Sequence, residues 1–200
     1  MIIDIRDYRL APGKRDQLIE RCESLFFPEQ ERLGAKFVGS FRDADDPDRF
    51  VFLRAMPDLD TRLRVLTAFY AEGEMWRTHR DEVNSWLADT DDVLLVRPVS
   101  EWAAPATGPS VVGMYSYIRR EPLADPAPLE RDVAAAVAAA GGRLLVTFAT
   151  DPAENNYPLH PIRTGEHGLT WFATFAVYRP LDLSTVAQRR LLPTAQSRLR

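Results

Sequence analysis

Three side chains near the start of the chain could do chemistry together. Asp4, Arg6 and Tyr8 occupy alternate positions, and a β-strand places alternate side chains on one face. An arginine beside a carboxylate could bind an anionic or enolic ligand, and a tyrosine hydroxyl could donate a hydrogen bond or relay a proton. The alternative is a buried ion pair that only orients two sheets. We expect these candidate catalytic residues to line a ligand cleft, with Ile3 and Ile5 facing helices.

A fourth candidate lies on a predicted amphipathic helix. Trp76, His79, Val83 and Trp86 recur at spacings of three and four, which places them on one helical stripe. His79 could act as a general base near neutral pH, or as an axial ligand of a haem lying against the tryptophans. The alternative is a packed histidine that bonds a backbone carbonyl. We expect no cofactor, with haem as a narrower alternative, and a substrate contact at Trp76.

A polar loop is expected at residues 151–168. Its two histidines, His160 and His167, flank Glu166, but their spacing matches no recognised metal site, so no metal is expected. The loop could clamp the mouth of a barrel, because its prolines stiffen it and its asparagines can bond the local backbone. The alternative is direct ligand contact. The loop residues expected to make it are Asn156, Tyr157 and Arg163.

The chain repeats its pattern of elements at an offset of about 109 residues. In each half an alternating strand precedes a helix that begins near a proline and ends at a glycine, and two further strands follow. These elements are expected at residues 2–10, 12–33, 36–41 and 49–56, and again at 111–119, 126–140, 143–148 and 169–178. The first half continues through a helix over 59–86, broken at Gly73, into a strand at 93–96. The second half leaves only residues 181–188 for its second helix, before a strand at 189–193.

This order predicts an α+β fold of two ferredoxin-like βαββαβ repeats, fused into a dimeric α+β barrel, with a truncated second helix in the second repeat. The expected domains are repeat 1 at residues 1–102, a linker at 103–110, and repeat 2 at 111–200 with the inserted loop 151–168. Ligands would lie in the cleft between the two sheets. The second repeat would supply an aromatic wall of substrate-binding residues, Tyr115, Tyr117 and Trp171.

Composition and charge exclude several classes of function. The formal net charge is −4 and the basic residues are scattered, so no nucleic-acid partner is expected. A single cysteine, Cys22, cannot form an internal disulfide, and neither a signal peptide nor a membrane span is recognisable. We therefore expect a cytoplasmic location and no membrane partner. Glycine-rich phosphate loops, dinucleotide fingerprints and nucleophile elbows are also absent from the sequence.

The chain resembles the NIPSNAP family, a branch of the dimeric α+β barrel superfamily. The motifs that carry the resemblance are IRDYRLAPGK (5–14), LGAKFVGSF (33–41), WRTHRDEVN (76–84), LVRP (95–98), NNYP (155–158), PIR (161–163) and PTAQS (193–197). Asp4 stands where the family usually carries Glu. Related barrels include cofactor-independent monooxygenases, polyketide cyclases, small-lactone isomerases and haem-handling enzymes, which are analogies of fold.

Two functions are compatible with these observations. The first is binding, and transformation without a nucleotide cofactor, of a small apolar or aromatic metabolite, with cyclase, isomerase or monooxygenase-like chemistry. The second is a non-catalytic module that binds a ligand or another protein. A homo-oligomer, expected as a dimer, would suit either function.

Overall fold

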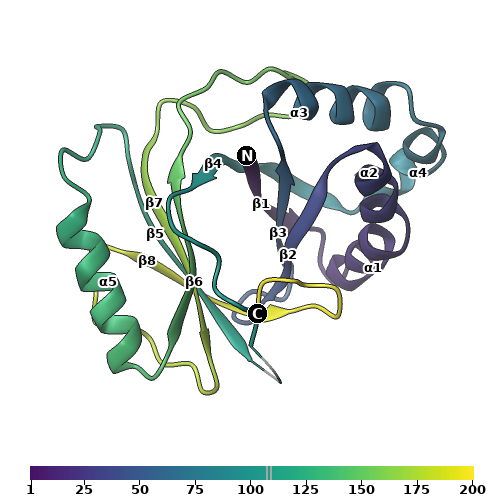
Figure 1. Cartoon of the computed structure of the whole chain (residues 1–200). Coiled ribbons are helices and arrows are strands. Elements are labelled where there is room, and N and C mark those ends of the chain that lie inside the picture. The colour runs from purple at the N-terminus through teal and green to yellow at the C-terminus, as the bar shows by residue number, and fades with distance from the viewer. Residues whose placement is uncertain (107, 109) are drawn as a thin grey trace.

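One continuous sheet organises the molecule (Figure 1). The computed structural model describes residues 1–106, 108 and 110–200. Its strands are β1 (Ile2–Leu10), β2 (Lys36–Asp43), β3 (Arg49–Met56), β4 (Leu87–Pro98), β5 (Val111–Arg119), β6 (Arg143–Thr150), β7 (His167–Phe175) and β8 (Ala187–Pro193). They close into a barrel in the order β1-β3-β2-β8-β5-β7-β6-β4. Each neighbouring pair is antiparallel.

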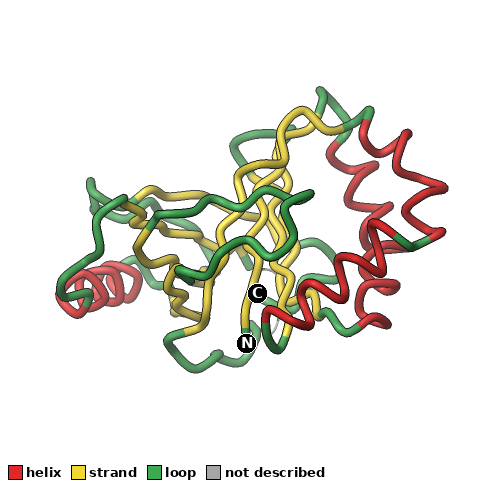
Figure 2. The backbone as a smooth tube through the Cα atoms, turned by 90° about the horizontal axis from the view of Figure 1, so that it is seen from above, coloured by secondary structure: helices red, strands yellow, loops and turns green. Residues whose placement is uncertain are grey.

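The helices lie outside the barrel on two opposite sides (Figure 2). One side carries α1 (Arg15–Arg21), α2 (Phe27–Leu33), α3 (Leu59–Leu66) and α4 (Glu74–Asn84), and the other carries α5 (Ala127–Ala139). The turns Cys22–Phe26 and Thr67–Ala71 are π-helical; the first joins α1 to α2, and the second extends α3 towards α4. Local sequence explains the ends: Asp58 accepts a hydrogen bond from the Thr61 amide at the start of α3, and Gly34 adopts a φ of 116° after α2.

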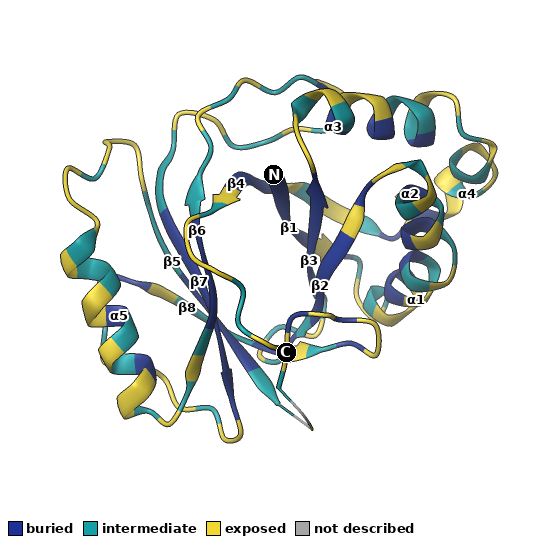
Figure 3. Cartoon of the chain, viewed as in Figure 1, coloured by how far each residue is buried: buried dark blue, intermediate teal, exposed yellow. Residues whose placement is uncertain are grey.

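Apolar side chains form three layers. In Figure 3 the buried residues, in dark blue, lie mainly on the strands and on the inner faces of the helices. The barrel lumen is packed with residues from both halves, including Ile3, Ile5, Phe41 and Phe172. A second cluster lies between the sheet and helices α1–α4, and a third lies between the sheet and α5. Strands such as β1 are therefore buried on both faces.

The fold class expected from the sequence is wrong. The sheet is a single closed barrel of antiparallel strands with few helices, rather than two βαββαβ repeats that form a dimeric α+β barrel. Two facts overturn the expectation. The pairings β2–β8 and β4–β6 join the halves into one sheet by backbone hydrogen bonds. In the described part of the second half, no helix separates β7 from β8, and the helix predicted over 181–188 does not form.

The side chains of β1 also point to the opposite sides of the sheet from those predicted. Ile3 and Ile5 point into the lumen, whereas Asp4, Arg6 and Tyr8 point towards helices α1–α4. Alternation alone separates two faces without saying which one lies inside, and here both are buried.

The aromatic residues expected to line the cleft also lie on the outer face of the sheet. Tyr115 and Trp171 pack in the cluster under α5, with Tyr117 at its edge. Within the described residues, no helix is long and apolar enough to cross a membrane.

Candidate functional site

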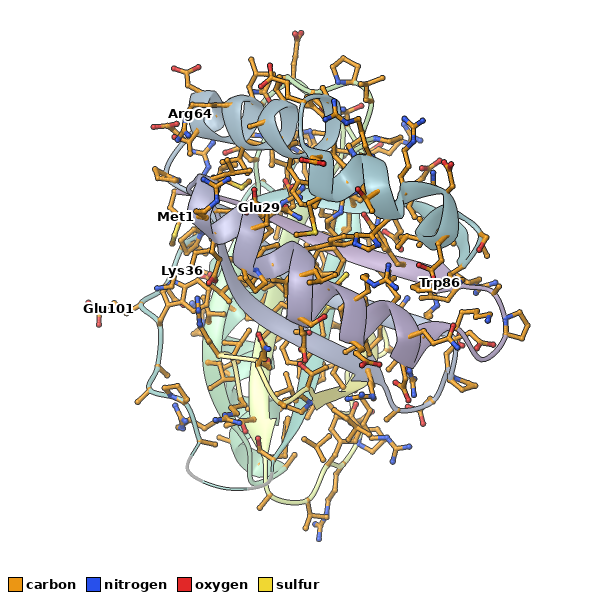
Figure 4. All side chains as sticks on the ribbon, turned by 90° about the vertical axis from the view of Figure 1, so that its right-hand side faces the viewer. Met1, Glu29, Lys36, Arg64, Trp86 and Glu101 are labelled. Carbon is orange, nitrogen blue, oxygen red and sulfur yellow. The ribbon has the colours of Figure 1, made fainter. Side chains whose placement is uncertain are left out.

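A cavity of about 340 Å³ lies between the sheet and helices α1–α4. Figure 4 views this side, with Glu29 on α2, Arg64 on α3 and Trp86 just after α4. The aromatic part of the wall is Phe26, Phe27, Phe52, Tyr70 and Trp76. Polar side chains line the cavity from β1, α2, α4, β4 and the 151–168 loop, and they include Tyr8, Gln30, Asn84, Thr90 and His160. The cavity is therefore suited to a mainly apolar molecule that carries a few polar atoms.

Tyr8 lines this cavity, and Arg6 holds its hydroxyl by a hydrogen bond. The Nε of Arg6 donates a hydrogen bond of 2.7 Å to the Tyr8 hydroxyl oxygen, and both side chains are buried. Burial raises the pKa of Tyr8 to about 12, although Arg6 opposes this shift. The hydroxyl is therefore neutral near pH 7. Because arginine can only donate, the phenolic hydrogen is left for another acceptor.

Asp4 joins three arginines behind Tyr8. Its carboxylate accepts hydrogen bonds from Arg54 at 2.5 Å and Arg62 at 3.0 Å, and Arg6 lies 3.6 Å away. All four side chains are 0% exposed. Burial acts to raise the pKa of Asp4, but the three guanidinium groups outweigh it and hold the pKa well below its usual range.

The cluster of Asp4, Arg6, Arg54 and Arg62 carries more positive than negative charge. One carboxylate faces three guanidiniums, so the formal charge of these four groups is 3 − 1 = +2. One nitrogen of each guanidinium, Arg6 Nη1, Arg54 Nε and Arg62 Nη2, also has no hydrogen-bond partner among the described residues. Burying such a surplus is costly, which favours negative charge on the neighbouring groups.

The 151–168 loop forms part of the cavity wall and is bonded to the same cluster. Arg62 donates to the side-chain oxygens of Asn155 at 3.2 Å and Asn156 at 2.7 Å. Asn156 in turn donates to the carbonyl of Leu59 at 2.6 Å, and Asn155 donates to the carbonyl of His160 at 2.9 Å. The asparagine pair therefore clamps the loop onto α3.

His160 sits between two tyrosine rings at the wall of the cavity. Its ring centroid lies 4.0 Å from that of Tyr70 and 5.6 Å from that of Tyr157. Its Nδ1 is 3.5 Å from Nη2 of Arg6, which can only donate, so this contact favours a proton on Nε2. Burial, with the nearby Arg6 and Arg54, lowers the pKa of His160 to about 2. The imidazole is neutral near pH 7.

The structure brings together some of the candidates from the sequence and separates others. Asp4, Arg6 and Tyr8 meet in one cluster, and Trp76 and Tyr157 line the same cavity. Asn156 contacts Arg62 and the backbone and does not line the cavity. Arg163 pairs with Asp92 at 2.8 Å and with Glu166 at 2.6 Å, at one end of the barrel. Tyr115 and Trp171 belong to the α5 side, and Tyr117 lies at its edge, where it also lines a second cavity at one end of the barrel.

His79 lies apart from the cavity. Its Nδ1 is 2.9 Å from Nη1 of Arg21, which also pairs with Glu82 at 2.9 Å. His79 therefore does not line the cavity, and haem binding stays a prediction. No group of three or more His, Cys, Asp or Glu side chains gathers as a metal site within the described residues.

Sequence reasoning missed Arg54, Arg62, Gln30, Tyr70 and the place of His160. One signal was available for Arg54. It is the only charge within the apolar run of β3, two positions from Phe52, and β1–β3 pairing places it opposite Asp4. Arg62 and His160 reach the site from other elements, and no local pattern marks them.

Comparisons with known proteins identify a family for the first half of the chain. A family model described as NIPSNAP matches residues 3–101. A NIPSNAP domain protein from Burkholderia xenovorans is 18% identical over 50% of this chain and 96% of its own, with a TM-score of 0.44. No curated protein gave a match.

Two similar structures span nearly the whole chain. A proposed monooxygenase from Lactobacillus acidophilus is 12% identical over 99% of this chain and 96% of its own, with a TM-score of 0.57. A proposed monooxygenase from Fusobacterium nucleatum is 8% identical over 96% of this chain and 91% of its own, with a TM-score of 0.58. These two matches show a shared fold. Residues 3–101, just under half of the chain, form a NIPSNAP domain.

Proposed function

We propose that the cavity beside helices α1–α4 binds a small, largely apolar or aromatic metabolite, and that Tyr8 donates a hydrogen bond to an oxygen atom of that molecule. The observation that carries the proposal is the 2.7 Å bond from Arg6 to the Tyr8 oxygen, which leaves the phenolic hydrogen for the ligand. The aromatic wall suits a flat apolar skeleton.

The charge behind Tyr8 supports a reaction through an oxygen anion. The formal surplus of +2 in the Asp4 cluster lies in a buried place, where a fixed charge acts more strongly than in water. An enolate or phenolate oxygen held by Tyr8 would be stabilised. Cyclase, isomerase and monooxygenase-like reactions without a nucleotide cofactor can all proceed through such an anion. The descriptions of the two long structural matches as proposed monooxygenases support this choice by analogy of fold.

A non-catalytic binding module is the second candidate, and the protonation states of the pocket favour it. A general base is most effective when its pKa lies near the working pH. Tyr8 has a pKa of about 12 and His160 a pKa of about 2, and the Asp4 carboxylate is held by arginines. None of these groups is poised to take a proton near pH 7.

Binding of two matched probes tests the hydrogen bond from Tyr8. We expect wild-type protein to bind 2-naphthol more tightly than 2-methylnaphthalene, measured by isothermal titration calorimetry. The Tyr8→Phe variant should bind 2-naphthol roughly tenfold more weakly, because about 1–1.5 kcal/mol of hydrogen bonding is lost. Tyr178→Phe is the matched control, since Tyr178 does not line the cavity. Equal affinity of wild type and Tyr8→Phe for 2-naphthol would contradict the proposal.

Proton exchange separates the enzyme from the binding module. In deuterated buffer, an enzyme that forms enolates should speed the exchange of the α-hydrogens of 2-tetralone, as followed by proton NMR. The same rate with wild type and Tyr8→Phe, no faster than in buffer alone, would favour the module.

A further inference from the structure

A second cavity, of about 540 Å³, lies inside one end of the barrel and plays no part in the function proposed above. Polar side chains project into it from five strands, each two positions from a residue of the lumen core. The pairs are Asp7 and Ile5, Asp92 and Leu94, Ser116 and Met114, Thr170 and Phe172, and Arg189 and Leu191. Because strand side chains alternate, these residues share the inner face. The lumen is therefore apolar in its middle and polar at this end.

Asp7 leaves one carboxylate oxygen without a partner in this cavity. The side chain is only 7% exposed. Its Oδ2 accepts a hydrogen bond of 2.8 Å from Arg49 and forms an ion pair with Arg189 at 2.8 Å. Its Oδ1 is buried and accepts no hydrogen bond from the described residues. Burial raises the pKa of Asp7, and the nearby Asp92 adds to this shift, although Arg189 and Arg49 oppose it. A buried acceptor of this kind favours a ligand that can donate.

The other side chains that line the cavity indicate which further polar and apolar parts a ligand would have. Ser116 and Thr170 carry hydroxyls that lie 3.5 Å apart, a long distance for a bond between them, so both can turn to a bound molecule. Met114 and Leu94 supply an apolar surface beside these hydroxyls. The site therefore combines polar and apolar contacts.

Two of the three arginines that line the cavity are paired with carboxylates, which argues against a charged ligand, and the third, Arg119, lies over the ring of Tyr117. Arg163 pairs with Asp92 and Glu166, and Arg189 pairs with Asp7 and Asp43. A charged molecule would have to compete with these ion pairs, whereas a hydroxyl group needs only an acceptor.

We propose that the lumen cavity is a separate binding site for a small uncharged molecule with hydroxyl groups. One hydroxyl donates to Oδ1 of Asp7, and the apolar part of the molecule lies against Met114. The proposal stands on the lumen residues alone and does not depend on Tyr8 or its pocket.

The test uses methyl NMR of the full chain labelled with ¹³C-methyl methionine. Met114 lines the lumen cavity, whereas Met75 packs in the cluster around the first pocket, so the two signals report separate sites. The probe is resorcinol, and its matched control is 1,3-dimethoxybenzene, which has the same ring but no donor. We expect resorcinol to shift the Met114 signal saturably, and the dimethyl ether to leave it in place.

Variants show whether Asp7 receives the hydrogen bond. Asp7→Asn should weaken the Met114 response to resorcinol roughly tenfold, and Thr170→Val should weaken it several-fold. Tyr8→Phe should leave it unchanged. Met56 is buried outside both cavities, so its signal reports whether each variant is folded. If Asp7→Asn does not fold, the Met114 response of Thr170→Val to resorcinol is the test. An unmoved Met114 signal, an equal shift with the dimethyl ether, or wild-type affinity in a folded Asp7→Asn would overturn the proposal.

Discussion

At the scale of single residues, the defining feature is one carboxylate among three buried guanidiniums. Asp4 contacts Arg6, Arg54 and Arg62, and none of the four side chains is exposed. The cluster holds β1 and β3 to α3, and it orients Tyr8 through Arg6. Its surplus of positive charge is a reason to expect ligands with an anionic or strongly polarised oxygen.

Asp4→Asn should be strongly destabilising. The substitution removes the only carboxylate of the cluster and leaves three buried cations without a counter-charge, so we expect a loss of about 3–5 kcal/mol in the free energy of unfolding. Urea denaturation followed by circular dichroism measures it. The matched control is Asp16→Asn, because Asp16 pairs with Arg42 at 2.8 Å but is 67% exposed, and such a pair contributes less than about 1 kcal/mol. Similar losses in the two variants would contradict the account of the cluster.

His160 should make stability depend on pH. Its pKa is lowered to about 2 in the folded state from about 6.5 when unfolded, so below pH 6.5 the unfolded chain binds a proton that the folded chain does not. The contribution of His160 to the free energy of unfolding is therefore present above pH 6.5 and is lost as the pH falls towards 2.

Between pH 7 and pH 5, wild type should lose about 2 kcal/mol more of its unfolding free energy than His160→Gln. Asp4 should not contribute in this window, because its carboxyl is ionised in both states there. Denaturation midpoints at the two pH values measure the difference. Parallel pH curves for the two proteins would show that the fold does not lower the pKa of His160.

At the scale of elements, the 151–168 loop forms part of the wall of the cavity. It supplies Tyr157 and His160 to the wall, and its asparagines bond Arg62 and the carbonyl of Leu59. The same loop places Arg163 at the end of the barrel, beside Asp92. One segment therefore borders both cavities.

Asn156→Ala should loosen this loop without unfolding the barrel. The variant loses the bonds to Arg62 and to the carbonyl of Leu59, which together contribute about 1–3 kcal/mol. Hydrogen exchange measured by mass spectrometry should accelerate in the loop and at the start of α3, while exchange in β3 stays slow. Glu154→Ala, at an exposed position of the same loop, is the control. Unchanged loop protection in Asn156→Ala would mean that other contacts hold the loop.

The positions of most elements could be predicted from the sequence. Which face of a strand lies towards the lumen and which towards the helices could not. The segment 49–56 is a strand as predicted, and the helix predicted over 126–140 forms over Ala127–Ala139. Alternation in β1 grouped Asp4, Arg6 and Tyr8 correctly, yet assigned them to the wrong side. Helices cover one face of β1 and the lumen core covers the other, so polarity could not tell the two apart. Contacts between distant segments, such as Arg62 with Asn156, leave no local pattern.

At the scale of the whole molecule, the barrel closes within one chain. Backbone pairing of β2 with β8 and of β4 with β6 joins the halves, and Phe41 and Phe172 stack across the lumen with centroids 6.0 Å apart. The duplicated strand pattern was visible in the sequence, but closure depends on pairings between segments about 150 residues apart in the case of β2 and β8. The dimer expected from the sequence stays a prediction, which light scattering of the full chain would test.

The most direct test of the central claim is the absorption spectrum of bound 4-nitrophenol. At a pH below its pKa in solution, the free probe is mostly the neutral phenol, and its phenolate absorbs at a longer wavelength. Because Tyr8 and the cationic cluster should stabilise the anion, we expect the phenolate band to appear on binding to wild type and to be much weaker with Tyr8→Phe. A bound probe that keeps the spectrum of the neutral phenol, or a phenolate band of equal strength in both proteins, would contradict the account.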